Sequence, residues 1–555
     1  MKLIFFFILF TAGLLIADPA QSLVRVNTTI QTYNASQPWE KTPPRQRRGL
    51  GCLLGNQQVL ITADMAADAI YLELESSDGN HTVPARVLAI DHEANLALLE
   101  PEKAGSFLEK LEAAEVSEPI ALGDKLDIYQ VETNGMALST PGEIRSMELI
   151  STFSSGSYFL SYLAKASMQS ASSSFTLPAF HEGKLVGILT SYDAKDQICE
   201  ILSVDIIQAF LDDQGTSPYE GFPSLGLAFT TTEDSHFRTW LGLADDQGGL
   251  YLSRILPTGT ADEAGLKKGD VLLAINGQEI DRRGYFQHPK YGALYWTHLV
   301  RGSMPVGSEV TLTCLRDGKV SDFKGVLKRP TDPLVPQDLH DQAPPFLIKG
   351  GLIFQELSQD LLQAYGKDWD SKAPLAFLDV LNNPAEYEEG RRRVVILTGV
   401  IPTAATIGYE RLGGQIVESV NGEKIAGLPE LAAALKKSPS DGLHRIDIDE
   451  VPYTIFLDEK ISTQVDQQFL QRGLPILERL YEIPTSNEKP VNVKTAEKIA
   501  AAEAEEIKKE APIEEAPPKT EIETDQAEKV PAQPAPGKMP EPPESEKIPE
   551  QPMVE

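Results

Sequence analysis

Cysteine is scarce in this chain, with Cys52, Cys199 and Cys314 the only three among 555 residues. So few thiols, and an odd number of them, argue against a disulfide framework and against a thiolate metal site. Cys52 and Cys314 lie in apolar runs typical of strands, and Cys199 adjoins another. We therefore expect three small, buried hydrophobic side chains, and we expect no metal and no cofactor.

Long apolar runs are missing too, except at the start of the chain. Lys2 precedes an apolar stretch from Leu3 to Ile16, and Ala20-Gln21-Ser22 follows, which predicts a secretory signal peptide over residues 1–22. The stretch is short for a membrane span, although retention as an uncleaved anchor is the alternative. Because no later segment is apolar enough to cross a bilayer, we expect an exported protein, periplasmic or extracellular, with no stable membrane span after signal cleavage.

Positive charge is in short supply. Lys and Arg number 50 against 81 Asp and Glu, a formal net charge of −31. This balance argues against binding to nucleic acid and to anionic lipid surfaces. The length is enough for about three or four domains, and a hydrophobic content of 41% can supply their cores.

Three segments in the first part of the chain form a recognisable pattern: Gly49–Cys52 (GLGC), Ile61–Ala67 (ITADMAA) and Asp91–Leu99 (DHEANLALL). They resemble the trypsin-like serine proteases of the HtrA/Deg family, which read close to G-S-G-F, I-T-N-A-H-V-V and H-E-x-D-L-A-L-L. The resemblance implies a trypsin-like double β-barrel. It also places Met65 where the family has its catalytic His, and Asn95 where it has the Asp that orients this His.

The residues at these two positions cannot perform the family's chemistry. A serine nucleophile needs a base to take its proton, and the base needs an anion to fix its tautomer. Met65 has no titratable group, and Asn95 carries no charge. We therefore expect a domain without proteolytic activity.

The region of the nucleophile agrees with this expectation. Ser170–Gly187 (SASSSFTLPAFHEGKLVG) stands where the family reads close to G-N-S-G-G-P-A-F-x-x-x-G-K-x-V-G. Alignment on Pro178-Ala179-Phe180 puts Phe175 at the nucleophile, whereas alignment on the upstream segment from Leu163 puts Ser174 there. In both registers the glycines are missing, and the backbone N–H groups of an oxyanion hole need their freedom at positive φ.

Activity would require a base from elsewhere. The candidates are His81, His92 and His181, each in a turn or loop where an exposed histidine without catalytic duty is the ordinary interpretation. Asp64 adjoins Met65, but a carboxylate with a pKa near ~4 is too weak a base for serine at neutral pH.

A second pattern begins after a linker rich in Gly, Pro and Ser. Ser224–Phe229 (SLGLAF) precedes the strand-like Gly249–Ile255, and Gly259–Gly277 then reads GTADEAGLKKGDVLLAING. This order of helix-turn, Gly-Asp turn and Asn-Gly hairpin resembles the PDZ domains of the same family. A PDZ domain adds a peptide as an extra strand and holds its carboxylate on backbone N–H groups. The resemblance assigns peptide binding to a set of loop and strand residues, namely Ser224, Leu225, Gly226, Leu227 and Phe229, and a PDZ fold with an occluded groove is the alternative.

A more divergent pattern follows. Ile348–Phe354 (IKGGLIF) looks like another carboxylate loop, Ile416–Gly422 (IVESVNG) repeats the strand and hairpin, and Leu428–Lys437 has the periodicity of an amphipathic helix. The segment resembles the second PDZ domain of the plant-type Deg branch, which is associated with assembly as much as with substrate. The peptide-binding residues that it implies are Gly350, Gly351, Leu352 and Ile353.

The expected fold class is mainly β: a trypsin-like double β-barrel, two α+β PDZ domains and a disordered tail. The expected segments are a signal peptide (1–22), an N-terminal arm (23–48), the protease-homologous domain (49–213), a first PDZ region (217–330, here PDZ1), a PDZ-like region (345–462, here PDZ2), a helical extension (463–485) and an acidic tail rich in Pro, Glu and Lys (486–555). The tail has no aromatic residue, so it cannot bury enough apolar surface to order itself.

Assembly is expected from the resemblance. Ser36–Glu40 (SQPWE) is similar to the family's entry segment, whose aromatic residue can pack on a neighbouring subunit, so we expect a homo-oligomer based on trimers. The alternative for Trp39 is anchoring in a core or linker of its own chain.

These observations leave three hypotheses. The first is an exported protease homologue without activity that binds unfolded or C-terminal peptides through its PDZ domains, as a chaperone-like scaffold in quality control or as the partner of an active paralogue. The second is an active serine endopeptidase with a rearranged centre. The third is a structural hub whose PDZ domains serve assembly alone.

Overall fold

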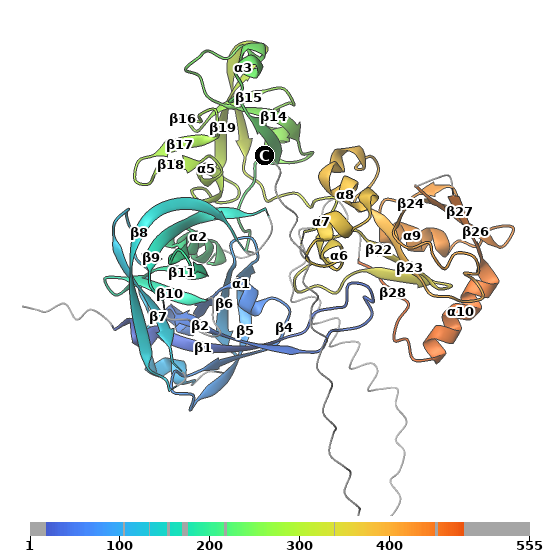
Figure 1. Ribbon diagram of the computed structural model, residues 1–555, viewed down its shortest axis with the longest axis horizontal. Coiled ribbons are helices and arrows are strands. Elements are labelled where there is room, and N and C mark those ends of the chain that lie inside the picture. Colours follow the sequence, from blue (N-terminus) through green and yellow to red (C-terminus); the bar gives the residue numbers. More distant parts are fainter. Residues whose placement is uncertain are drawn as a thin grey trace, which may run out of the picture. The chain divides into compact units, whose positions relative to one another are not determined.

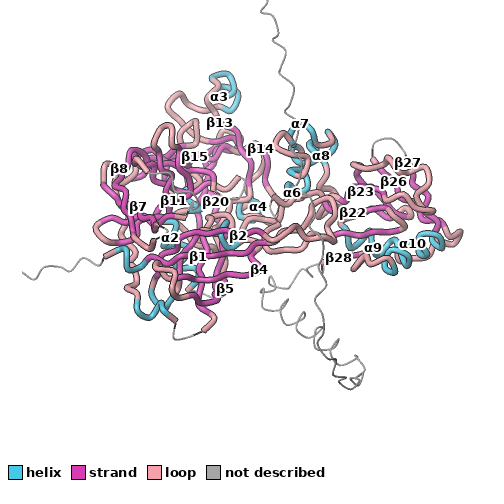
Figure 2. The backbone as a smooth tube through the Cα atoms, turned by 60° about the horizontal axis from the view of Figure 1, so that its bottom comes forward, coloured by secondary structure: helices cyan, strands magenta, loops and turns pink. Residues whose placement is uncertain are grey.

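The computed structural model describes residues 18–481 except for 104–105, 133, 153–155, 169–175, 216–218, 338 and 450–452. Residues 1–17 of the expected signal peptide lie outside the described residues, and the expected disordered tail lies entirely outside them. Strands dominate the described chain (Figure 1, Figure 2). This confirms the expected mainly β fold class.

In the described part of the chain, the first closed barrel has the strand order β1-β2-β3-β6-β5-β4. Its strands are β1 (Leu23–Ile30), β2 (Arg45–Leu53), β3 (Val59–Ile61), β4 (Ala69–Glu75), β5 (Thr82–Asp91) and β6 (Leu96–Pro101). Its short helices are η1 (Pro19–Ser22), η2 (Gly55–Gln57), α1 (Ala63–Ala66) and η3 (Phe107–Lys110).

The first barrel begins earlier than expected. β1 pairs with β2 on one side and with β4 on the other, so residues 23–30 close the barrel instead of forming an arm. Alternate residues Val24, Val26 and Thr28 are buried, which is the period of a strand with one face on a core. The expected boundary at residue 49 is therefore wrong, and only the segment between β1 and β2 leaves the barrel.

The second closed barrel has the order β10-β11-β12-β9-β8-β7. Its strands are β7 (Lys125–Val131), β8 (Ala137–Ser151), β9 (Tyr158–Ala166), β10 (Leu177–His181), β11 (Lys184–Asp193) and β12 (Ile198–Ser203). Helix α2 (Val204–Gln214) follows and buries Ile206, Ile207 and Phe210 in the barrel core. Cys52, Cys199 and Cys314 are free, and all three are buried, as predicted.

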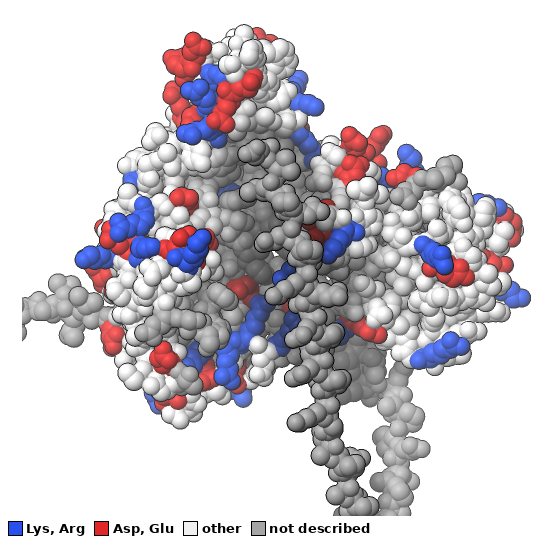
Figure 3. All heavy atoms as spheres, viewed as in Figure 1, with Lys and Arg blue, Asp and Glu red and all other residues white. Residues whose placement is uncertain are grey.

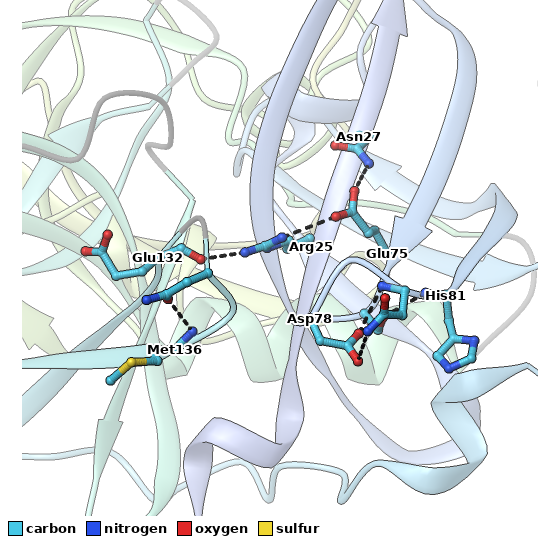
Figure 4. A network of polar contacts seen from close by, with 10 residues as sticks. Arg25, Asn27, Glu75, Asp78, His81, Glu132 and Met136 are labelled. Atoms are coloured by element: carbon cyan, nitrogen blue, oxygen red, sulfur yellow. Dashed lines mark hydrogen bonds and ion pairs between the residues drawn. The ribbon is translucent and has the colours of Figure 1, made fainter.

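A polar network joins the two barrels (Figure 4). Arg25 on β1 pairs with Glu75 on β4 at 3.2 Å and also donates to the carbonyl oxygen of Glu132 beyond β7. A Cβ atom on Gly135 would lie 2.8 Å from the carbonyl oxygen of Ser77, so the two loops are in close contact. The network fixes the loop after β7 against the first barrel.

The PDZ1 region contains a sheet in the order β13-β14-β15-β19-β20, with β16 paired to β15, and a separate hairpin of β17 and β18. Its strands are β13 (Leu227–Thr231), β14 (Leu250–Ile255), β15 (Val271–Ile275), β16 (Gln278–Glu279), β17 (Tyr285–His288), β18 (Gly292–Tyr295), β19 (Glu309–Arg316) and β20 (Lys319–Val326). Its helices are α3 (Ser235–Leu241), α4 (Thr260–Glu263) and α5 (His298–Arg301).

The PDZ2 region contains a sheet in the order β27-β26-β24-β23-β22-β21-β28, with β25 paired to β24. Its strands are β21 (Phe346–Lys349), β22 (Leu352–Glu356), β23 (Val395–Val400), β24 (Gln415–Val420), β25 (Glu423–Lys424), β26 (Leu443–Ile448), β27 (Tyr453–Asp458) and β28 (Glu478–Arg479). Its helices are α6 (Gln359–Gln363), α7 (Trp369–Lys372), α8 (Leu375–Asn382), η4 (Pro384–Glu386), α9 (Leu428–Leu435) and α10 (Glu459–Gln471).

The end of PDZ2 differs from the expected helical extension over 463–485. Helix α10 starts at Glu459, directly after β27, because Asp458 caps it by accepting from the N–H of Ile461 at 2.7 Å. After the helix, β28 returns to the sheet and pairs with β21. Residues 463–481 therefore belong to the PDZ2 region, with β28 as a strand of its sheet.

Trp39 contacts its own chain. Its ring lies 5.8 Å from that of Phe346 on β21, in an apolar cluster that includes Ile348 and Phe469. Arg479 of β28 donates to the carbonyl oxygen of Pro38 at 2.9 Å. These contacts correspond to the second of the two roles considered for Trp39, anchoring within its own chain.

Candidate functional site

Met65 lies in the core of the first barrel. It is on α1, the single turn between β3 and β4, and is 5% exposed. A Cβ atom on Gly49 would lie 2.8 Å from the terminal methyl carbon of Met65, so the thioether lies directly over the glycine of β2. The side chain at the position of the family's base is thus packed among apolar neighbours.

Asn95 is held beside the same turn. It has a left-handed backbone with φ of 56°, which asparagine tolerates better than most residues. Its buried side-chain oxygen accepts from the backbone N–H of Asp64 at 3.0 Å. The structure therefore brings positions 65 and 95 together, as the resemblance implies, but Asn95 binds the backbone of α1 and not a catalytic base.

Neither Met65 nor Asn95 can act as a general base. Met65 presents a thioether and Asn95 a neutral amide, and neither accepts a proton at neutral pH. Between the barrels, the hydroxyl oxygens of Thr62 and Thr176 lie 2.6 Å apart. Ser174 and Phe175, the two candidates for the nucleophile position, lie outside the described residues.

The other candidate bases have contacts elsewhere. The Nε2 atom of His92 lies 3.1 Å from the carboxylate of Asp341, and its ring lies 4.6 Å from that of His340. His181 contacts the carbonyl oxygen of Lys125. For His81 the contact is made by the backbone, whose N–H donates to the hydroxyl oxygen of Ser76 at 3.1 Å (Figure 4).

The predicted carboxylate loop of PDZ1 has the geometry of a turn at Gly226. The residue has a φ of 69°, which lies in the left-handed region and favours glycine. Its N–H donates to the hydroxyl of Ser224 at 3.1 Å, and its carbonyl accepts from the N–H of Leu256 at 2.9 Å. Ser224 is itself anchored, since its N–H donates to the carbonyl of Lys328 at 2.8 Å. The loop is held on both sides.

Strand β13, which follows this loop, lies at the edge of its sheet. Among the described strands it pairs with β14 alone. Leu225 is buried, Leu227 is half-buried, and the half-buried Phe229 packs edge-on against Trp296, 5.5 Å away, just before α5. The structure therefore brings the five predicted residues of PDZ1 together on one loop and one open strand edge.

The corresponding strand of PDZ2 has no open edge. β22 pairs with β23 on one side and with β21 on the other, where Ile348 is opposite Ile353. Leu347 of β21 packs into the core formed with Leu428 and Leu431 of α9. The chain's own residues 346–349 thus occupy the place beside β22 where an added strand would lie.

The carboxylate loop of PDZ2 is also occupied. The N–H of Gly350 donates to one oxygen of Asp466 at 2.7 Å, and the Nζ atom of Lys349 lies 2.8 Å from the other. A Cβ atom on Gly351 would lie 2.6 Å from the carbonyl oxygen of Ile401. The prediction that Gly350, Gly351, Leu352 and Ile353 bind a peptide is therefore not supported by this geometry, because an internal carboxylate and an internal strand fill the site.

Sequence reasoning missed Asp466. It lies on α10, 116 residues after Gly350, where an acidic residue in an amphipathic helix looks like part of a solvated face. The local sequence contains no signal for such a contact.

In the part of the chain that the structure describes, no group of three or more His, Cys, Asp or Glu side chains has the arrangement of a metal site. Within the same residues, no helix combines the length and the apolarity that a membrane span requires.

Comparison with known proteins places this geometry in a family. Two family models with the description "PDZ domain" match residues 224–284 and 335–474. The chain is 25% identical over 472 residues to Protease Do-like 4, mitochondrial, of Arabidopsis thaliana, covering 84% of this chain and 85% of that protein. It is 24% identical over 453 residues to the Putative protease Do-like 3, mitochondrial, of the same plant, covering 81% and 78%.

A bacterial relative matches over a shorter range. The Periplasmic serine endoprotease DegP of Escherichia coli (strain K12) is 29% identical over 196 residues, 35% of this chain and 31% of that protein. Among solved structures, "HtrA-type protease AlgW with decapeptide" aligns with a TM-score of 0.43 at 19% identity, covering 56% of this chain and 97% of that one.

The two closed barrels, the two PDZ matches and the plant relatives together define the class as a trypsin-like β-barrel protease fold with PDZ domains. The comparisons support an HtrA/Deg-family protein with PDZ domains, similar over most of its length to the Do-like proteins of plants. The names of its relatives state several locations: mitochondrial and chloroplastic for some plant proteins, and periplasmic for DegP.

Proposed function

We propose that this member of the HtrA/Deg family is an exported protease homologue without proteolytic activity, which binds unfolded or C-terminal peptides as a scaffold in protein quality control. The observation that carries the proposal is Met65, whose buried thioether occupies the position of the base and packs over Gly49. An active serine endopeptidase with a rearranged centre is the second candidate, with Ser174 as the nucleophile to be tested.

The absence of activity has a direct test. The purified protein should not degrade casein, and Ser174→Ala should leave any background unchanged. A fluorophosphonate probe, which reports an activated serine, should not label the protein. Casein cleavage or probe labelling that disappears in Ser174→Ala would support the active enzyme instead.

For peptide binding we propose the PDZ1 region alone. Its support is the left-handed turn at Gly226 and the edge strand β13, since a peptide adds to an open strand and its carboxylate to loop N–H groups. The full chain should bind peptides with an apolar C-terminal residue at micromolar affinity, roughly 7–8 kcal/mol. The region 217–330 expressed alone should do the same.

Two changes separate carboxylate capture from other modes of binding. Amidation of the peptide removes the charge that the loop holds, so binding should be lost without any change to the protein. Gly226→Trp should abolish binding too, because a Cβ atom there would lie 3.1 Å from the Cα atom of Gly259. Circular dichroism should show the variant folded. Binding that survives both changes would favour the third hypothesis, a structural hub.

Export and assembly complete the proposal. Export is supported by the apolar run from Leu3 to Ile16 after Lys2, and N-terminal sequencing of secreted protein would locate the cleavage site. A trimer-based homo-oligomer is supported by family membership only, because Trp39 packs within its own chain. Light scattering would test it, and co-purification would reveal an active paralogue.

A further inference from the structure

Three arginines on β2 stand apart from the rest of this acidic chain. Arg45, Arg47 and Arg48 are all exposed. Among the described residues, no carboxylate lies within ion-pair distance of any of them, whereas Arg25 on the neighbouring strand pairs with Glu75. Figure 3 shows Lys and Arg side chains gathered on the face of the first barrel. In a protein of net charge −31, this is a local positive surface.

The same segment has an unpaired strand edge. β2 pairs with β1 from Arg45 to Cys52, but it pairs with β3 only at Cys52 and Leu53. Over Arg45–Arg48 no described strand lies on its second edge. An open edge of this kind can accept an extended chain through its backbone N–H and C=O groups.

The strand leads into the place that the family uses for catalysis. Gly49, which follows Arg48, lies against Met65, and Arg47 donates from its guanidinium to the backbone carbonyl of Asp64 at 2.6 Å. This contact fixes the guanidinium of Arg47 beside α1. Side chains alternate along a strand, so Arg45 and Arg47 face one side and Arg48 the other.

We propose that the edge of β2 at Arg45–Arg48 is a second binding surface, which takes an extended acidic polypeptide segment by strand addition, with its carboxylates paired to the three arginines. The surface is separate from PDZ1, and binding there does not depend on whether the protein is active. The negative charge of the whole chain opposes large polyanions, while a short segment responds to charges within a Debye length of about 10 Å.

Binding of a fluorescent peptide to the full chain tests the proposal. An acidic peptide with an amidated C-terminus, which PDZ1 should not hold, should bind, and a Lys-rich peptide of equal length should not. The triple variant Arg45→Ser, Arg47→Ser, Arg48→Ser should weaken the binding about tenfold, as expected from three solvent-exposed ion pairs. Added salt should weaken the binding to the native chain more than to the variant.

The matched control changes three exposed cations elsewhere. Lys267, Lys268 and Lys319 of the PDZ1 region are exposed, so Lys267→Ser, Lys268→Ser, Lys319→Ser removes the same charge and should leave binding within about twofold. Equal weakening in both triple variants would overturn the site, because only the net charge would then matter.

A second probe tests strand addition. N-methylation of alternate residues of the acidic peptide removes the N–H groups that face β2 and should weaken binding, while its charge stays the same. Dextran sulfate, a polyanion without a peptide backbone, should not compete at an equal concentration of charge. Equal binding of the methylated peptide, or full competition by dextran sulfate, would show a general anion surface and overturn the assignment to a polypeptide.

Discussion

The backbone N–H of Gly350 donates to the carboxylate of Asp466 at 2.7 Å, and Lys349 pairs with the same carboxylate at 2.8 Å. This is the kind of contact that a PDZ loop makes with the end of a peptide, formed here within one chain. Because β21 also lies beside β22, the chain itself makes the contacts in PDZ2 that a bound peptide would make. We infer that PDZ2 serves to hold the chain together.

Asp466→Ala should loosen this arrangement. The side chains of Asp466 and Lys349 are only 13% and 17% exposed. The variant leaves the N–H of Gly350 without its acceptor and the ammonium of Lys349 with the hydroxyl of Thr463 but no carboxylate, at a cost of about 1–3 kcal/mol. Hydrogen exchange of the Gly350 amide should speed up about fivefold to a hundredfold. Gln464→Ala, an exposed position on the same helix, should have no effect. Unchanged exchange in Asp466→Ala would mean that the contact does not stabilise PDZ2.

Trp39→Ala should lower stability and leave assembly unchanged. The ring lies in the cluster with Phe346, Ile348 and Phe469, so its removal takes apolar surface away from PDZ2 and should lower the melting temperature. Light scattering should report the same molar mass as for the native chain. Dissociation of an oligomer by Trp39→Ala would restore the role of the aromatic residue between subunits.

Substitutions at Asn95 should separate backbone conformation from hydrogen bonding. Asn95→Gly keeps the left-handed backbone and loses only the acceptor for the N–H of Asp64. Asn95→Ala loses both and should be less stable than the glycine variant by about 1 kcal/mol. Asn95→Asp keeps an acceptor and should unfold at nearly the same urea concentration as the native protein. An alanine variant as stable as the glycine variant would contradict this account.

Met65 should behave as a core residue. Met65→Leu conserves volume and should cost less than about 1.5 kcal/mol, while Met65→Ala should cost about 2–5 kcal/mol. Met65→His should destabilise as well, because it buries an imidazole among apolar groups, and it should not create casein cleavage, since Asn95 cannot fix its tautomer. Restored cleavage in Met65→His would show that the rest of the catalytic machinery is intact.

Features set by local sequence could be predicted. The Asn-Gly hairpins need positive φ at both residues, and Asn276 and Gly277 have φ of 49° and 79° in PDZ1, while Asn421 and Gly422 have 53° and 79° in PDZ2. The barrel motifs predicted that positions 65 and 95 meet. Strand β1 was missed although Val24, Val26 and Thr28 alternate, because the motifs of the family begin only at Gly49.

Features set by contacts distant in sequence could not be predicted. The pairing of β21 with β28 and the contact of Trp39 with Phe346 depend on tertiary packing, which leaves no periodicity or turn signal in the sequence. The loop of PDZ2 was predicted correctly as a loop, but whether it is open depends on a carboxylate from another helix. Whether a binding loop is open or filled by another part of the chain is therefore harder to predict than the fold that carries the loop.

A group of polar side chains lies where PDZ1 contacts the second barrel. The hydroxyl of Tyr291 donates to Asp205 of α2 at 2.8 Å, and the hydroxyl of Tyr162 donates to the same carboxylate at 3.2 Å. His288 stacks on Tyr291 at 4.5 Å, and its ring lies 5.8 Å from that of His298 on α5. His298 is 4% exposed and is thus more deeply buried than His288.

Because of this burial, His298 should make the contact sensitive to acid. Burial lowers its pKa from 6.5 to about 4; the nearby Asp205 opposes the shift and His288 adds to it. Above about pH 6.5, the imidazole is neutral in both the folded and the unfolded chain. Between about pH 6.5 and 4, only the unfolded chain takes up the proton. The free energy of unfolding therefore falls as the pH falls through this range, by up to about 3 kcal/mol. His298→Gln should remove this part of the pH dependence, measured as the difference from the native chain in calorimetric melting temperature, whereas the exposed His236→Gln should not. If the melting temperatures of the native chain and of His298→Gln differ by the same amount at about pH 7 and about pH 4, His298 is not the group that destabilises the fold in acid.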